Sequence, residues 1–269
     1  MSQVLRRLLA GGLAILLATA GAEEPVHVAV GDSLAVGMGA SPSGDGGFVS
    51  LLTDQNPVCR EDRCPDLELV NLASPGATSA VVVTAQLGRA VEVISDRDVA
   101  LVTVTVGGND LFSSVFGSCR QGPTEPCRRA AGEAFAAYLE NLDQILGELR
   151  AASGPDTPIV TMTLYNPFPA CLLSDLAPAA EMILEGGATT LGGFNDLIRI
   201  VVGSHGVAVA ETTRLLSNTD YVGGLDCIHP NASGHEKLAA AFGAALGSRL
   251  SHPAGSGPLA GSRRSRRGP

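Results

Sequence analysis

The sequence contains no tryptophan, and only three tyrosines and seven phenylalanines occur among its 269 residues. Proteins that bind polysaccharide or single-stranded nucleic acid by stacking need exposed aromatic rings, so a stacking surface is not expected here. Basic residues are also scarce, with 18 lysines and arginines against 27 aspartates and glutamates and a net charge of −9. An acidic surface repels phosphate backbones, which argues against a nucleic-acid partner and favours solubility.

The two ends of the chain differ from the region between them. Residues 1–22 carry Arg6 and Arg7 ahead of an apolar run at 8–20 and small residues, the pattern of a secretory signal peptide. This run is short for a membrane span, although an uncleaved anchor and a twin-arginine export signal are alternatives. Residues 253–269 are rich in Gly, Ser, Pro and Arg, which predicts a disordered basic tail.

The region between these ends, residues 23–252, has the length of one α/β domain with a full core. Six arginines and no carboxylate lie in the two end segments, so a chain of net charge −9 leaves −15 on this region. Strong attraction to anionic lipid is therefore not expected. We expect an exported, monomeric protein without an integral membrane span.

Six cysteines in an exported chain indicate disulfides, and six thiols allow 15 pairings. Proximity along the chain favours Cys59–Cys64 and Cys119–Cys127 as small loop closures. These leave Cys171–Cys227 as a long-range bridge. A metal site at Cys59 and Cys64 is disfavoured because no second close cysteine pair and no nearby histidine accompany them.

Apolar, β-branched runs alternate with helical patterns, which is typical of a parallel sheet covered by helices. This pattern predicts an α/β fold, a three-layer α/β/α sandwich with a five-stranded, parallel, flavodoxin-like sheet. Apolar residues at three- and four-residue steps predict a helix over 129–152, and a final helix follows Ser233. A helical region at 175–203 is interrupted by two glycine pairs. The expected strands are 26–30, 67–73, 99–106, 158–165 and 206–211.

Polar residues follow three of these strands and precede the last helix. They are Gly31-Asp32-Ser33, the segment 74–78 (SPGAT), the segment 107–110 (GGND) and the segment 226–235 (DCIHPNASGH). In a doubly wound sheet, ligands bind beyond the carboxyl ends of the strands, so these segments are expected on one edge. This convergence favours Ser33 as a nucleophile over the alternative of a helix N-cap.

In order and spacing, these four segments resemble the four sequence blocks of the SGNH (GDSL) hydrolase family, and the likeness spans about residues 26–250. In character the chain is most similar to the secreted actinobacterial lipases and esterases of that family. The resemblance implies a carboxylic ester hydrolase, and it implies an oxyanion hole formed by the backbone N–H groups of Ser33 and Gly76 and the side-chain amide of Asn109.

A serine hydroxyl attacks an ester only when a positioned base removes its proton. His229 is the candidate base, and Asp226, three residues upstream in the same short loop, would orient it and stabilise the imidazolium. Asp110 competes as the acid, but it more simply charges a helix start. Asp32 is interpreted as a structural hydrogen-bond acceptor. Asn231 begins a glycosylation sequon that more plausibly caps the last helix.

The sequence says less about the substrate. The connection after the fourth strand is apolar, and it would either line an acyl pocket or pack in the core through Phe168, Leu172, Leu173, Leu176, Met182 and Ile183. We favour an ester with an apolar acyl chain. An acetyl- or aryl-esterase acting on small or carbohydrate esters and a non-catalytic binding protein on the same scaffold are the alternatives. No cofactor motif is present, and no cofactor or metal is expected.

Overall fold

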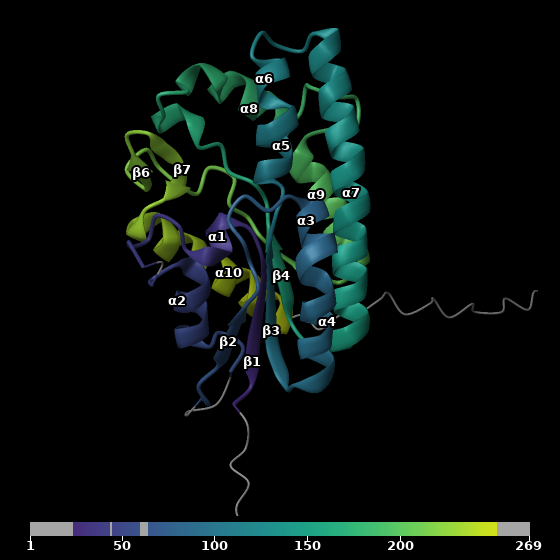
Figure 1. Ribbon diagram of the computed structural model, residues 1–269, viewed down its shortest axis with the longest axis vertical. Helices are drawn as coiled ribbons and strands as arrows, with labels where there is room; N and C mark the ends of the chain where they lie inside the picture. Colours follow the sequence, from purple (N-terminus) through teal and green to yellow (C-terminus); the bar gives the residue numbers. More distant parts are fainter. Residues whose placement is uncertain (1–23, 44, 60–63, 252–269) are drawn as a thin grey trace, which may run out of the picture.

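The computed structural model describes residues 24–43, 45–59 and 64–251 (Figure 1). The expected signal peptide, residues 1–22, and the expected basic tail, residues 253–269, lie outside the described residues. Both therefore stay predictions.

A five-stranded, all-parallel sheet forms the centre of the molecule, with strand order β2-β1-β3-β4-β5. This order is the flavodoxin-like one, so the predicted fold class is confirmed. Each observed strand falls within its predicted run or extends one residue past it. The strands are β1 (Val26–Gly31), β2 (Glu68–Asn71), β3 (Val99–Thr105), β4 (Ile159–Met162) and β5 (Ala208–Ala210).

Helices cover both faces of the sheet, with α1, α2 and α10 on one face and α3, α4, α7 and α9 on the other (Figure 1). Their bounds, with α5, α6 and α8 at the carboxyl end of the sheet, are α1 (Ser33–Val36), α2 (Phe48–Gln55), α3 (Ser79–Val81), α4 (Leu87–Asp96), α5 (Gly108–Ser114), α6 (Phe116–Cys119), α7 (Glu125–Ser153), α8 (Ala177–Glu185), α9 (Phe194–Ser204) and α10 (Ala232–Ser251). A π-helical turn, η1 (Val82–Gln86), joins α3 to α4, and the 3-10 turns η2 (Phe168–Ala170) and η3 (Ser174–Leu176) precede α8.

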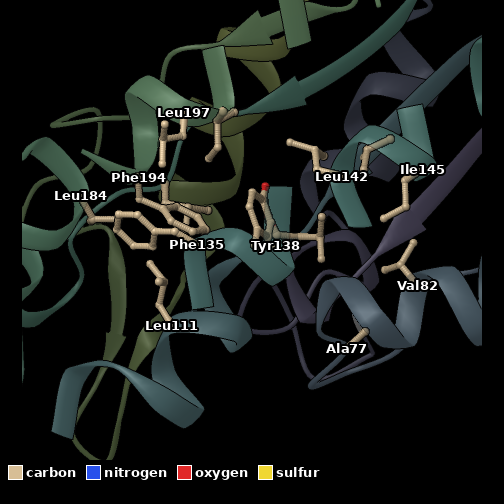
Figure 2. Packing of buried hydrophobic residues seen from close by; sticks show 14 of the residues in the cluster. Ala77, Val82, Leu111, Phe135, Tyr138, Leu142, Ile145, Leu184, Phe194 and Leu197 are labelled. Carbon is tan, nitrogen blue, oxygen red and sulfur yellow. The ribbon is translucent and has the colours of Figure 1, made fainter. Parts of the chain in front are cut away.

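The longest helix, α7, packs its predicted apolar face into the larger of two cores (Figure 2). Phe135 and Tyr138 on this helix stand against Phe194 of α9, with ring centroids 5.0 and 4.5 Å apart. Burying a side chain of this size contributes about 1.5–3 kcal/mol. These contacts hold α9 against α7. The hydroxyl of Tyr138 also donates to the carbonyl of Val106, which ties α7 to the end of β3.

The predicted break at the two glycine pairs separates α8 from α9, and the last helix begins one residue before Ser233. The structure contains disulfides between Cys59 and Cys64, Cys119 and Cys127, and Cys171 and Cys227. These are the two pairs that proximity favours and the long-range pair that they leave.

One segment differs from expectation. Residues 226–229, expected in a loop, lie on a strand, β7 (Asp226–Pro230), which pairs antiparallel with β6 (Tyr221–Gly223). This hairpin packs closely on the segment after α1. A Cβ atom on Gly39 would lie 2.2 Å from the carbonyl oxygen of Pro230, so only glycine fits between them.

Candidate active site

Ser33 is the first residue of α1, and only Asp32 separates it from Gly31 at the end of β1. The carboxyl group of Asp32 accepts a hydrogen bond from the backbone N–H of Leu34 at 3.0 Å. Asp32 is therefore the N-cap, and the alternative interpretation of Ser33 as the cap is wrong. The structural role expected for Asp32 agrees with this contact.

Gly31 sets the direction in which the chain leaves β1. Its φ is +140°, and a Cβ atom there would lie 2.0 Å from the carbonyl oxygen of Thr105. The next backbone N–H, that of Asp32, donates to the same oxygen at 3.1 Å. This tight junction between β1 and β3 holds Ser33 at the carboxyl edge of the sheet.

Ser33, His229 and Asp226 form a row of hydrogen bonds. The Oγ atom of Ser33 lies 2.9 Å from Nε2 of His229. On the other side of the ring, Nδ1 lies 2.8 and 3.0 Å from the two carboxylate oxygens of Asp226. Because a carboxylate only accepts, Nδ1 carries the proton and Nε2 is left to accept from the serine hydroxyl. A base in this tautomer can take the proton of Ser33.

The strand that carries this pair is held from both sides. The disulfide Cys171–Cys227 joins it to the segment before α8. The hydroxyl of Tyr165 donates to the carbonyl of Ile228 at 3.1 Å. Asp226 also accepts from the backbone N–H of His229 at 3.2 Å, so the carboxylate is anchored to the ring and to the backbone of one residue.

Gly76 and Asn109 approach one another from separate segments. Gly76 adopts φ +76° in the turn after β2 and is exposed. Asn109 lies in the first turn of α5, and its side-chain amide donates to the carbonyl of Ala77 at 3.0 Å. Asn109 lines the same cavity as Ser33.

Asp110, the alternative acid, has a different partner. Its carboxylate accepts from the backbone N–H of Ser79 at 3.0 and 3.1 Å and from the hydroxyl of the same residue at 2.5 Å. It therefore caps the start of α3 and ties α5 to that helix. The carboxylate bonded to His229 is that of Asp226.

A cavity of about 220 Å³ opens beside Ser33 and His229, and apolar side chains form most of its wall. Phe112 and Phe168 stack in this wall with centroids 6.4 Å apart. The apolar lining comes from the end of β3, from α5 and α6, from β4 and the segment after it, from α8 and from β7. Together with Leu34 of α1, it consists of Val106, Leu111, Phe112, Phe116, Met162, Leu164, Pro167, Phe168, Leu184 and Ile228.

Of the six residues for which the sequence left a pocket and core packing open, only Phe168 lines the cavity, and core packing holds for four of the others. Leu172 is 73% exposed and points away from the protein interior, while Leu176 and Ile183 are buried in the core behind the cavity. Leu173 and Met182 are packed against that core. α5 and α6 contribute Leu111, Phe112 and Phe116 to this wall, and the rings of Phe112 and Phe116 meet edge to face with centroids 6.3 Å apart.

Asp32 is the buried carboxyl group of the site. Burial raises its pKa to about 7, although hydrogen bonds from Leu34 and Thr105 act in the opposite direction. The carboxyl group lines the cavity next to the serine. It changes charge near neutral pH.

His235 lies in the first turn of α10 and has a structural role. Its Nδ1 accepts from the backbone N–H of Phe48, and its Nε2 donates to the carbonyl of Met38 at 2.9 Å. Burial lowers the pKa of this ring, which keeps it neutral. Asn231 caps α10 by accepting from the N–H of Gly234, which agrees with the capping role expected for it.

Within residues 24–43, 45–59 and 64–251, no group of three or more His, Cys, Asp or Glu side chains is arranged to hold a metal ion. No helix in the same residues is long and apolar enough to cross a membrane.

A hydrogen-bonded Ser–His–Asp row at the carboxyl edge of a parallel sheet is an arrangement that serine hydrolases use. The model of the GDSL-like lipase/acylhydrolase family matches residues 29–237. The chain therefore belongs to this family, and it is a carboxylic ester hydrolase by class, as the sequence predicts.

Solved structures with the same fold include several lipases. A lipase from a goat rumen metagenome is 23% identical, with 82% of this chain and 97% of the lipase covered and a TM-score of 0.61. Phospholipase A1 from Streptomyces albidoflavus is 21% identical, with coverage of 83% and 100% and a TM-score of 0.55. An extracellular lipase from Streptomyces rimosus is 19% identical, with coverage of 82% and 99% and a TM-score of 0.55. No curated protein matches the chain.

Proposed function

We propose that the protein is an exported serine esterase or lipase that forms an acyl-enzyme on Ser33. The observation that supports this most directly is the 2.9 Å contact between Ser33 Oγ and His229 Nε2 at the mouth of an apolar cavity. His229 is the general base and Asp226 the acid that orients it.

In the first half of the reaction, Ser33 Oγ attacks the carbonyl carbon of the ester while its proton moves to Nε2 of His229. Asp226 stabilises the imidazolium that forms, because both of its carboxylate oxygens lie within 3.0 Å of Nδ1 and accept its hydrogen bond. His229 then returns the proton to the leaving alkoxide, and an alcohol departs. In the second half, water replaces the alcohol and the acid is released.

Negative charge on the carbonyl oxygen requires donors that are already in place. We assign these to the backbone N–H groups of Ser33 and Gly76 and the side-chain amide of Asn109. The positive φ of Gly76 and the bond from Asn109 to Ala77 O bring the two latter segments together, which supports the assignment.

The substrate is an ester whose acyl chain enters the apolar cavity. Phe112, Phe116 and Phe168 present an apolar surface that would desolvate a hydrocarbon chain. Two proteins of the same fold are named as a phospholipase A1 and a lipase, and both names agree with an acyl chain of this kind.

Export is supported by three disulfides, which persist in oxidising compartments. We assign residues 1–22 to a cleaved signal peptide, residues 23–252 to the hydrolase domain and residues 253–269 to a basic tail. The enzyme would act as a monomer without a cofactor.

The test is hydrolysis of p-nitrophenyl esters from acetyl to palmitoyl by the mature protein, with Ser33→Ala in parallel. We expect hydrolysis that depends on Ser33 and an optimum at an acyl chain of several carbons. Ser95→Ala, a variant at a serine on α4 that bonds only the carbonyl of Val91 among the contacts described, is the matched control and should keep full activity.

An optimum at acetyl would favour a small-ester or deacetylating enzyme over a lipase. Equal rates in wild type and Ser33→Ala would overturn the mechanism. A folded wild-type protein without hydrolysis of any chain length would favour the non-catalytic binding protein.

A further inference from the structure

Large apolar side chains are exposed around the mouth of the cavity. Of the eight that are exposed in the described part of the chain, five lie on segments that bound the cavity. These five are Met38, Phe112, Leu172, Val222 and Leu225. Leu225 is 96% exposed and Leu172 is 73% exposed. Removing such apolar side chains from water would lower the free energy.

Two of these side chains are brought together by the disulfide. Leu172 follows Cys171, and Leu225 precedes Cys227 by two residues, so the Cys171–Cys227 bond joins the two segments that carry these exposed side chains. Figure 1 shows the β6–β7 hairpin beside the segment that leads into α8. Phe112 continues this surface into the cavity, because its ring is 46% exposed and also lines the cavity wall.

Val222 on the same hairpin is apolar too. Its side chain lies against Gly39, next to Met38, and Gly39 in turn contacts the strand that carries His229. We call the five exposed side chains the apolar rim.

The four segments that carry the apolar rim contain no charged residue. They are residues 36–43, 111–119, 166–174 and 221–225. Charged residues adjoin these segments directly, among them Arg120, Asp175 and Asp226, so the uncharged surface is confined to the segments themselves. Anionic lipid headgroups attract Lys and Arg side chains, and the four segments contain neither. The apolar rim therefore suits a surface of neutral or zwitterionic lipid.

We infer that the apolar rim seats the enzyme on a lipid–water interface of neutral or zwitterionic esters. The inference rests on the proposed function, since the rim lies on segments next to the cavity in which the acyl chain would bind. Insertion of Leu172 and Leu225 into the lipid would align the cavity mouth with the layer, so that an acyl chain moves from lipid to Ser33 without crossing water. A second copy of the chain on the same surface would instead close the mouth.

The experiment measures co-sedimentation with phosphatidylcholine vesicles in a Ser33→Ala background, where binding occurs without turnover. Leu172→Ser/Leu225→Ser should lower the partition coefficient at least about ten-fold, because two apolar side chains no longer enter the lipid. Ile200→Ser, a variant at a 67% exposed residue on α9 outside the four segments, is the matched control and should bind like the parent.

The same substitutions, made with Ser33 intact, are assayed on dissolved p-nitrophenyl acetate and on phosphatidylcholine vesicles. We expect unchanged hydrolysis of the dissolved ester and a loss of at least about ten-fold on vesicles for the double variant. This pair of assays separates the two proposals. If the wild type fails on the dissolved ester, the proposed function fails, and the vesicle-binding result still decides whether the rim binds lipid.

Vesicle binding by the double variant equal to that of its parent would overturn the inference, as would a parent that does not bind vesicles. Sedimentation without lipid identifies the other occupant. A wild-type dimer that Leu172→Ser/Leu225→Ser dissociates would show that a second copy covers the rim, and it would overturn the lipid assignment.

Discussion

The side chain of Gln86 pairs with both backbone groups of Gly31. Its Oε1 accepts from the N–H of Gly31 at 2.7 Å, and its Nε2 donates to the carbonyl of the same residue at 2.9 Å. This amide thus acts as a short piece of neighbouring strand at the point where β1 ends. Gln86 is buried in the π-helical turn before α4 and lies 55 residues from Gly31 in the sequence. It nevertheless fixes the backbone that presents Ser33.

Gln86→Ala should lower both stability and activity. Two backbone groups would lose their partner, at a cost of about 1–3 kcal/mol for each group that stays buried and unbonded. Because the displaced backbone carries Ser33, we expect kcat to fall more than KM changes. Thermal unfolding and ester kinetics measure both effects. Gln144→Ala, a variant at an exposed residue bonded to Glu148, should change neither, and an equal loss in both variants would contradict the role of Gln86.

Asn109→Ala should lower kcat on the order of 100- to 1000-fold with little change in KM, because a donor that acts on the transition state is lost. Asn141→Ala is a matched control. The side-chain amide of Asn141 donates to Ser79 Oγ at 2.9 Å, so this substitution removes a similar structural hydrogen bond. Steady-state kinetics on one dissolved ester compare the two. Similar losses in both variants would mean that Asn109 acts only by holding the fold.

The buried carboxyl group of Asp32 should make the protein less stable as the pH rises. Its pKa is about 7 in the folded protein against an ordinary value of 3.8. Between these values the folded state holds a proton that the unfolded state has lost, so unfolding becomes easier as the pH increases from about 4 to about 7. Above the folded pKa the effect is constant.

Asp32→Asn removes this titration and keeps an oxygen that can accept from Leu34 and Thr105. Its stability relative to wild type should therefore increase from pH 4 to pH 7 and then level off. Urea unfolding at a series of pH values measures the difference, with Asp54→Asn, at an exposed residue on α2, as the control. A difference that does not vary with pH would refute the assignment.

The disulfide Cys171–Cys227 should matter for activity, whereas Cys59–Cys64 should matter only for stability. In the chain-entropy model, the first closes a long loop and contributes about 4 kcal/mol, and the second closes a short one and contributes about 2 kcal/mol. Only the first adjoins Asp226. Paired Cys→Ser variants, assayed for unfolding and for ester hydrolysis, distinguish the two. Full activity without Cys171–Cys227 would show that β6–β7 holds Asp226 and His229 by itself.

The sequence predicts the sheet well because its strands are short apolar runs separated by long helical patterns. It places Ser33, Asn109 and His229 on one edge because parallel strands end together. It misses the β6–β7 hairpin, although Gly223-Gly224 between Val222 and Leu225 is a turn signal for two paired strands.

Two features of the site have weaker signals. A glutamine such as Gln86 usually lies on a helix surface, and nothing in the local pattern marks it as buried. The segment after β4 is apolar, and that property alone does not tell a cavity wall from core packing. Phe112 and Phe116 lie on the short helices α5 and α6, and only the tertiary packing shows that both rings meet the cavity.

The most direct test of the central claim is covalent labelling of the intact protein with an alkyl fluorophosphonate, followed by mass spectrometry. A nucleophilic serine next to a general base displaces fluoride and keeps the phosphonyl group. The predicted result is one adduct, on Ser33, absent in Ser33→Ala and formed on the order of 1000-fold more slowly in His229→Ala. An adduct on another residue, or labelling of Ser33→Ala at the wild-type rate, would contradict the assignment of Ser33 and His229.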